Sequence, residues 1–126
     1  MEHRLINNLT LCIAYFDEIA SLFMFTKNWS VLRSLSKILH IIAINNFKVF
    51  ENKERLLATY FEFIENRECP IAVRCNIYDI LLRYCSVYPE ICQEVKLRIE
   101  FDLVHINSAA LLSRGKRVLQ KLERIS

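Results

Sequence analysis

Residues 70–88 read PIAVRCNIYDILLRYCSVY, and their apolar side chains recur at the spacing of an α-helix. One face carries apolar residues at i, i+4, i+7, i+11 and i+14, namely Ile71, Cys75, Tyr78, Leu82 and Cys85. This spacing is typical of an amphipathic helix. The other faces are also largely hydrophobic, with Ile77, Ile80, Leu81 and Tyr84. Because a helix that is apolar over most of its circumference must contact neighbours on several sides, we predict that it lies inside an all-α domain.

The same apolar pattern occurs again 40 residues later and 40 residues earlier. The later copy consists of Leu111, Gly115, Val118, Leu122 and Ile125, and the earlier copy of Val31, Leu35, Ile38 and Ile42. Arg74 and Arg114 keep the same offset, whereas Arg33 is displaced by one residue. A pattern repeated at a constant offset is typical of stacked helical repeats. A compact six-helix bundle is the simplest alternative, but a bundle needs no such repeat.

Three further helices are predicted between these segments. Apolar spacing, together with helix start and stop residues, places them at about 8–25, 50–65 and 89–106. Pro70 and Pro89 are each expected in a first helical turn, and Ser108 is expected to cap the last helix. The connections are only a few residues long, so neighbouring helices should run antiparallel. The chain is therefore predicted to form about three antiparallel helical hairpins in one domain spanning residues 1–126.

The composition argues against other fold classes and against cofactor sites. The chain of 126 residues has one glycine and two prolines, whereas average usage predicts about nine and six. Hairpin-rich β folds need many such turn residues. Glycine-rich phosphate loops, dinucleotide-binding loops and nucleophile elbows also depend on glycine. We therefore expect no cofactor.

The hydrophobic fraction of 53% raises the question of a membrane segment. The longest uncharged apolar-rich runs, residues 5–16 and 38–47, are each shorter than the roughly 20 residues that span a bilayer. A signal peptide beginning at Arg4 is the alternative, but Asn7 and Asn8 interrupt its apolar region and no small-residue cleavage site follows. We expect a cytoplasmic protein without a membrane partner.

The cysteines favour the same location. An odd count of five without paired short spacings is typical of reduced thiols. A zinc site built from Cys69, Cys75, Cys85 and Cys92 is the alternative, but their gaps of six, ten and seven match no structural zinc pattern. Thiols at apolar helical positions act as small hydrophobic side chains. We expect no metal site.

A resemblance to a known family covers nearly the whole chain. The residues Cys69-Pro70-Ile71-Ala72-Val73-Arg74, followed by Ile80-Leu81-Leu82 and Val87-Tyr88-Pro89-Glu90, resemble a HEAT-type repeat. Residues 114–122 and 29–42 resemble the next and the preceding repeat. The chain is most similar to short HEAT-like proteins of Bacteroidota-type bacteria. The family pattern has an Asp about six residues before the helix Arg, where this chain has Lys27, Glu68 and Ser108, so it resembles a divergent member.

This resemblance implies a HEAT/armadillo-like α-α superhelix in a bacterial cytoplasm. Repeats of this kind usually serve as binding surfaces for proteins and, in one branch, for DNA. Since a fold does not by itself define a function, the binding role is an expectation by analogy.

Three arginines, Arg33, Arg74 and Arg114, occupy the first turns of the three repeated helices. Stacked repeats need contacts that set their register, so each arginine is predicted first to bond a preceding loop carbonyl or an acid on a neighbouring repeat. Capture of a ligand is the alternative role.

The last helix is strongly basic. Residues 108–126 contain five basic residues and one acid, and the side chains of Arg114, Arg117, Lys121 and Arg124 share one face. A polar outer face is expected for the last helix of a solenoid, and basic residues near a helix C-terminus stabilise it. A phosphate-binding face is the alternative.

The aromatic residues are predicted first as packing residues rather than stacking platforms. They are Tyr15, Phe16, Phe23, Trp29, Phe25, Tyr60, Phe61 and Phe63. The first predicted helix is rich in apolar residues for the end of a solenoid, which suggests a homodimer through that end.

We therefore predict a non-catalytic helical-repeat scaffold that binds another protein. A nucleic-acid-binding protein that uses the basic last helix is the second hypothesis, and an enzyme is the third. The candidate catalytic acids, Asp17, Glu18, Asp79 and Asp102, have no base nearby in the sequence. The candidate binding residues are Arg74, Arg114, Arg117, Lys121 and Arg124.

Overall fold

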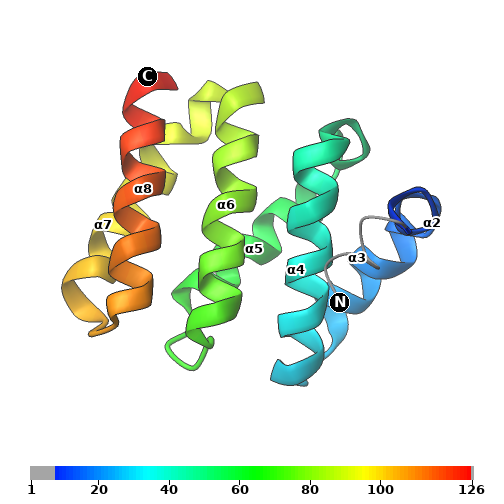
Figure 1. The fold of residues 1–126 in the computed structure, drawn as a ribbon, viewed down its shortest axis with the longest axis horizontal. Helices are drawn as coiled ribbons and strands as arrows, with labels where there is room; N and C mark the ends of the chain where they lie inside the picture. The colour runs from blue at the N-terminus through cyan, green and yellow to red at the C-terminus, as the bar shows by residue number, and fades with distance from the viewer. Residues whose placement is uncertain (1–7, 126) are drawn as a thin grey trace.

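The computed structural model describes residues 8–125, and this part of the chain is helical without any β-strand (Figure 1). Helical residues make up 85% of it. The elements are α2 (Leu9–Ala14), α3 (Phe16–Phe25), α4 (Trp29–Asn45), η1 (Phe47–Phe50), α5 (Glu54–Glu65), α6 (Ile71–Val87), η2 (Pro89–Ile91), α7 (Cys92–His105) and α8 (Ala109–Ile125), where η denotes a short 3-10 helix. The prediction of an all-α fold is confirmed. Within residues 8–125, no helix combines the length and the hydrophobicity that crossing a bilayer requires.

The helices form two layers. The three helices that carry the recurring apolar pattern, α4, α6 and α8, lie side by side and run in the same direction, while α5 and α7 lie behind them and α3 lies beside α4 at the end of the row (Figure 1). The central helix, α6, packs against both α4 and α8. Two hydrogen bonds join α6 to α4 across a separation of 40 residues: Asn76 Nδ2 donates to Ser36 Oγ at 3.0 Å, and Arg83 Nε donates to the Ala43 carbonyl at 3.3 Å. Residues 40 apart in the sequence are therefore neighbours in space.

The hydrophobic core is one continuous cluster. It includes the apolar positions predicted on α6, where Cys75, Tyr78 and Cys85 are buried. Between the layers the core is rich in aromatic side chains; the ring centres of Phe47 and Tyr84, for example, lie 4.9 Å apart with the rings almost perpendicular. Such edge-to-face contacts add to the burial of the rings themselves.

Several predicted boundaries are wrong. The helix predicted over residues 8–25 is two helices, because the chain bends at Tyr15 (φ −104°, ψ 22°). The bend lets α2 contact α4 while Phe16 packs edge-on against Phe50, with ring centres 4.8 Å apart. The helices predicted from residues 50 and 89 begin at Glu54 and Cys92, since short 3-10 helices precede them.

The predicted caps are largely correct. Pro89 occupies the first turn of η2, whereas Pro70 lies one residue before α6, at its N-cap. Ser108 caps α8, because its Oγ accepts a hydrogen bond from the Leu111 amide at 3.2 Å. The side chain of Asn28 caps α4 in the same way, accepting from the amides of Ser30 and Val31.

Most aromatic residues pack as predicted, but two do not. Trp29 is half-buried and lies edge-on against Phe63, with ring centres 5.9 Å apart. Tyr15 and Phe25 are 54% and 59% exposed, so the packing role predicted for them is wrong. Both lie on the solvent side of α2 and α3, where Leu11 is also more than half exposed.

Candidate functional site

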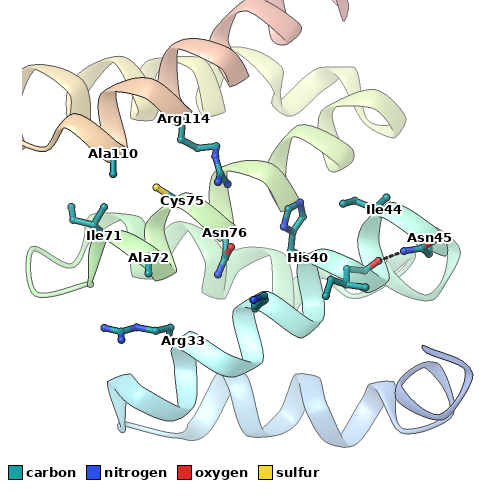
Figure 2. A pocket seen from close by; sticks show the side chains of 12 residues that line it. Arg33, His40, Ile44, Asn45, Ile71, Ala72, Cys75, Asn76, Ala110 and Arg114 are labelled. Carbon is teal, nitrogen blue, oxygen red and sulfur yellow. Dashed lines mark hydrogen bonds between the residues drawn. The ribbon is translucent and has the colours of Figure 1, made fainter. Parts of the chain in front are cut away.

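A groove of about 910 Å³ lies on the outer side of α4, α6 and α8 (Figure 2). It is lined by Arg33, Lys37, His40, Ile41, Ile44, Asn45, Ile71, Ala72, Cys75, Asn76, Ala110 and Arg114. Residues three, four or seven apart share a helix face, and this spacing brings Arg33, Lys37 and His40 to the groove from α4. Because the three helices are parallel and adjacent, their outward faces together form one surface.

Asp79 on α6 lies close to lining residues from both outer helices of this groove. Its side chain is only 11% exposed, and its Oδ2 accepts a charge-assisted hydrogen bond from Arg114 Nη1. His40 Nε2 lies 3.8 Å from the same carboxylate oxygen. The acid on α6 therefore pairs with a cation on α8 and lies close to a histidine on α4.

The surroundings of His40 and of Cys75 disfavour the charged form of each side chain. Burial lowers the pKa of His40 below its usual value; Asp79 opposes this change, while Arg114 and Arg117 add to it. Burial also raises the pKa of the Cys75 thiol. A thiol with a raised pKa is a poor nucleophile at neutral pH.

The charge of the groove is positive. Its lining contains the cations Arg33, Lys37 and Arg114 and no carboxylate. The exposed Arg117 lies close enough to lower the pKa of His40 and so adds to the same positive field. The apolar part of the lining consists of Ile41, Ile44, Ile71, Ala72 and Ala110. The groove can therefore hold anionic groups and apolar groups together.

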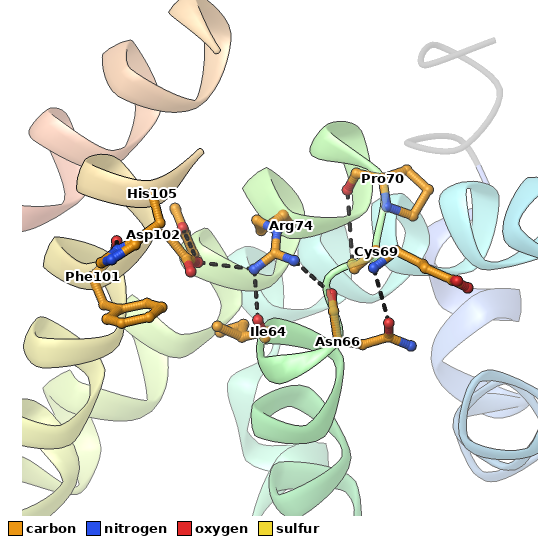
Figure 3. Close-up of polar contacts among 10 residues, drawn as sticks. Ile64, Asn66, Cys69, Pro70, Arg74, Phe101, Asp102 and His105 are labelled. Carbon is orange, nitrogen blue, oxygen red and sulfur yellow. Dashed lines mark hydrogen bonds and ion pairs between the residues drawn. The ribbon is translucent and has the colours of Figure 1, made fainter. Parts of the chain in front are cut away.

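Arg74 lies elsewhere, in a buried network behind α6 (Figure 3). Its side chain is 1% exposed, and Nη1 donates to the Ile64 carbonyl at 2.6 Å and to Asp102 Oδ2 at 3.0 Å. Nη2 donates to the Asn66 carbonyl at 2.7 Å. Tyr78 donates its hydroxyl proton to the same Asp102 oxygen at 2.5 Å.

These contacts explain the role of Arg74. The carbonyls of Ile64 and Asn66 lie at the C-terminus of α5, where helical carbonyls have no partner within their own helix. Arg74 caps that end and, through Asp102, joins α6 to α7. The first role predicted for the arginines, a bond to a loop carbonyl or to an acid on a neighbouring helix, is confirmed for Arg74 and Arg114. Arg33 is instead exposed at the groove.

The predicted basic face of α8 is divided by the structure. Arg114 is partly buried in the groove, whereas Arg117, Lys121 and Arg124 are exposed along α8 and are not in the groove lining. Sequence reasoning missed Lys37 and His40 as groove residues, and it missed the pairing of Asp79 with Arg114. One signal was present in the sequence: Asp79 is an acid between the apolar residues Tyr78 and Ile80.

The cysteines mainly serve the core. Cys75, Cys85 and Cys92 are buried at helical positions, as predicted, Cys69 is buried in the loop before α6, and Cys12 is half-buried. Burial raises the pKa of Cys69 to about 11 and that of Cys85 to about 12. Among residues 8–125, no group of three or more His, Cys, Asp or Glu side chains is placed to hold a metal ion.

No protein-family model matches the sequence, and neither a curated protein nor a solved structure shows significant similarity to it. The resemblance to HEAT-like proteins therefore stays a prediction based on the motif residues.

Proposed function

We propose that this protein is a non-catalytic helical-repeat scaffold that binds a partner protein in the groove formed by α4, α6 and α8. The proposal includes a HEAT/armadillo-like α-α superhelix of three hairpins and a cytoplasmic location. The parallel layer of α4, α6 and α8 supports the superhelix, and so do the two hydrogen bonds that span 40 residues. In such repeats each unit packs only on its neighbours, which leaves one extended face for binding.

The open shape of the groove is the observation that carries the proposal. Small-molecule sites bury most of the surface of their ligand. Here Ile44 in the lining is 55% exposed, and Arg33, Ala72 and Ala110 are exposed as well. A groove that leaves its lining open on one side suits a polypeptide segment, which can extend beyond the site at both ends.

Comparison of two exposed apolar residues tests this proposal. Ile44 in the groove is 55% exposed, and Leu97 on α7, outside it, is 52% exposed. Tagged wild-type protein, Ile44→Glu and Leu97→Glu would each be purified from cells at moderate salt, and the co-purifying polypeptides identified. We expect at least one polypeptide to be retained by the wild type and by Leu97→Glu but lost with Ile44→Glu. If no polypeptide depends on Ile44, the groove is not a protein-binding site.

A nucleic acid is the second candidate ligand, because Arg117, Lys121 and Arg124 are exposed on α8. Each phosphate contact should add about 0.9 to the slope of log affinity against log salt concentration for duplex DNA. A titration of labelled single- and double-stranded DNA at low and near-physiological salt, with Arg117→Glu/Lys121→Glu beside the wild type, tests this. Salt-sensitive binding that the double variant loses would favour the nucleic acid over the protein partner.

A homodimer through the N-terminal end also remains a proposal. Between residues 8 and 25, the large apolar residues that are more than half exposed are Leu11, Tyr15, Leu22 and Phe25. A second copy that covers them would remove this apolar surface from water. A strictly monomeric mass in solution at all micromolar concentrations would exclude it.

A further inference from the structure

We infer that the groove binds an acidic segment of the partner polypeptide, whose carboxylates pair with Arg33, Lys37 and Arg114. Apolar side chains of the same segment pack against Ile44 and Ile71. The inference rests on the proposed function, since it names the chemistry of the partner at that same groove.

Charge complementarity is the first support. Three cations line the groove and no carboxylate does, so an approaching acid meets no like charge in the lining. Asp79, which contacts Arg114 and His40 of the lining, is 11% exposed and is already bonded to Arg114. With Asp79 counted, three positive charges and one negative charge leave the groove positive. Complementary charge of this kind speeds encounter and excludes partners of the wrong sign.

The hydrogen-bond donors of Arg114 are the second support. A guanidinium group has five N–H donors in a rigid fork, and the contact with Asp79 engages Nη1. The side chain is 31% exposed, so other donors of the fork face the groove. Because Asp79 holds the fork in place beforehand, little side-chain entropy is lost when a carboxylate binds it.

The arrangement of the cations is the third support. Arg33 and Lys37 stand one turn apart on α4, which is about 6 Å of helix rise. Arg114 stands on the opposite wall, on α8, and the floor between the walls comes from α6 (Figure 2). The floor carries Ile71 and Ala72. A segment that crosses from α8 to α4 therefore meets a cation at each end and apolar side chains in between.

The lining favours a polypeptide over a nucleic acid. Proteins that bind single strands stack the bases on aromatic side chains, and this stacking supplies much of their affinity. No Phe, Tyr or Trp lines this groove; its apolar contacts come from isoleucine and alanine. These side chains suit the aliphatic residues of a peptide.

The test is a selection from a displayed library of random peptides on the intact protein, followed by affinity measurement with synthetic copies of the enriched peptides. We expect the enriched peptides to contain an excess of Asp and Glu together with Leu, Ile or Phe. Their affinity should fall at least tenfold with Arg33→Glu/Lys37→Glu. The matched control Lys48→Glu/Arg67→Glu carries the same change of charge at exposed residues outside the lining, and it should bind as the wild type does.

A milder variant and charge-reversed peptides serve as further controls. If Arg33→Glu/Lys37→Glu does not give the helical circular dichroism of the wild type, Arg33→Ala replaces it, because Arg33 is exposed and its truncation leaves the core intact. Peptides in which every Asp and Glu is replaced by Lys should not bind the wild type. They should gain affinity for the charge-reversed variant.

The possible failures are distinguishable. Enriched peptides without acidic residues that still lose binding with Ile44→Glu would overturn the acidic segment and keep the protein-binding groove. If no peptide depends on the groove, the inference is wrong, and so is the binding site named in the proposed function. Binding of a labelled DNA strand that Arg33→Glu/Lys37→Glu abolishes, without any acidic peptide, would assign the groove to nucleic acid instead.

Discussion

Replacement of Arg74 by methionine is expected to destabilise the folded protein by about 3–5 kcal/mol, the usual cost of removing one partner of a buried ion pair. Methionine retains an unbranched apolar stem but has no donor. The change would leave the buried carboxylate of Asp102 without its cation and the carbonyl of Ile64 without its donor, while the carbonyl of Asn66 keeps the Cys69 amide as a donor.

The size of the loss follows from these contacts. The guanidinium makes three hydrogen bonds, and a bond to a charged group contributes about 1.5–3 kcal/mol. Two features reduce the simple sum. Tyr78 still donates a hydrogen bond to Asp102 in the variant. A cavity of about 640 Å³ beside Arg74 and Asp102 also lets water reach the polar groups that the substitution leaves unpaired. Since a domain is stable by about 5–15 kcal/mol in total, the variant should lose a large part of its stability.

Urea unfolding followed by circular dichroism measures this effect. With a slope of about 1–3 kcal/mol per molar urea, the midpoint should fall by about 1 M or more. The matched control is Arg98→Met, because Arg98 also pairs with two acids, Glu65 and Glu94, but its side chain is 36% exposed. Exposed ion pairs contribute about 0–1 kcal/mol, so this variant should lose little.

A double-mutant cycle separates the pair from the rest of the network. Asp102→Asn keeps an oxygen that accepts from Arg74 and Tyr78 but removes the charge. Because Arg74 and Asp102 are in direct contact, the double variant should lose less than the sum of the two single variants, by about 0.5–3 kcal/mol. A loss below about 1 kcal/mol for Arg74→Met, similar to that of Arg98→Met, would refute the assignment of Arg74 as a buried cap that joins helices.

Three further predictions follow from individual side chains. Burial lowers the pKa of His40, so the unfolded chain binds its proton more readily, and stability should fall as pH drops from about 6.5 towards the folded pKa. The free energy of unfolding of His40→Asn, measured with urea, should lack that part of the pH dependence. A pH profile identical to that of the wild type would contradict this prediction. In the folded protein a disulfide reagent should react quickly only with Cys12 of the five cysteines, and with all five in denaturant. A second fast thiol in the native state would show that the core is open. Gly115→Ala should change stability by less than about 1 kcal/mol, because a gain in helix propensity of that size opposes a contact of 2.7 Å between the new Cβ and Leu103 Cδ2. In a Leu103→Ala variant, where that contact is absent, Gly115→Ala should raise the free energy of unfolding. A lower free energy of unfolding there would contradict this prediction.

The helices that sequence analysis predicted best are α4, α6 and α8. Their signals are local: apolar residues recur every three to four positions, and Pro70 and Ser108 mark where α6 and α8 begin. The constant offset of 40 residues also predicted that these helices are neighbours, and the hydrogen bond from Asn76 to Ser36 shows that register directly.

The break at Tyr15 was not predictable in the same way. The residues around it fit a continuous helix, and the backbone hydrogen bonds from Tyr15 to Leu11 and from Ile19 to Tyr15 are still formed. The bend depends on the positions of Phe50 and α4, which no local pattern contains. The exposure of Phe25 likewise depends on helix packing that no local pattern contains.

By itself, the sequence determined the all-α class, the recurrence of one apolar pattern at an offset of 40 residues and the basic character of the last helix, because each depends only on residue types and spacing along one chain. The tertiary structure alone decided which charges meet. Asp102 reaches Arg74 across 28 residues and Asp79 reaches Arg114 across 35, and only helix packing brings them together. It also decided that Arg74 is buried, whereas Arg33, Lys37 and Arg114 line one groove. The physical reason is that a binding surface is the sum of faces from several helices, and the relative rotation of those helices is fixed by side-chain packing between them rather than by any helix alone.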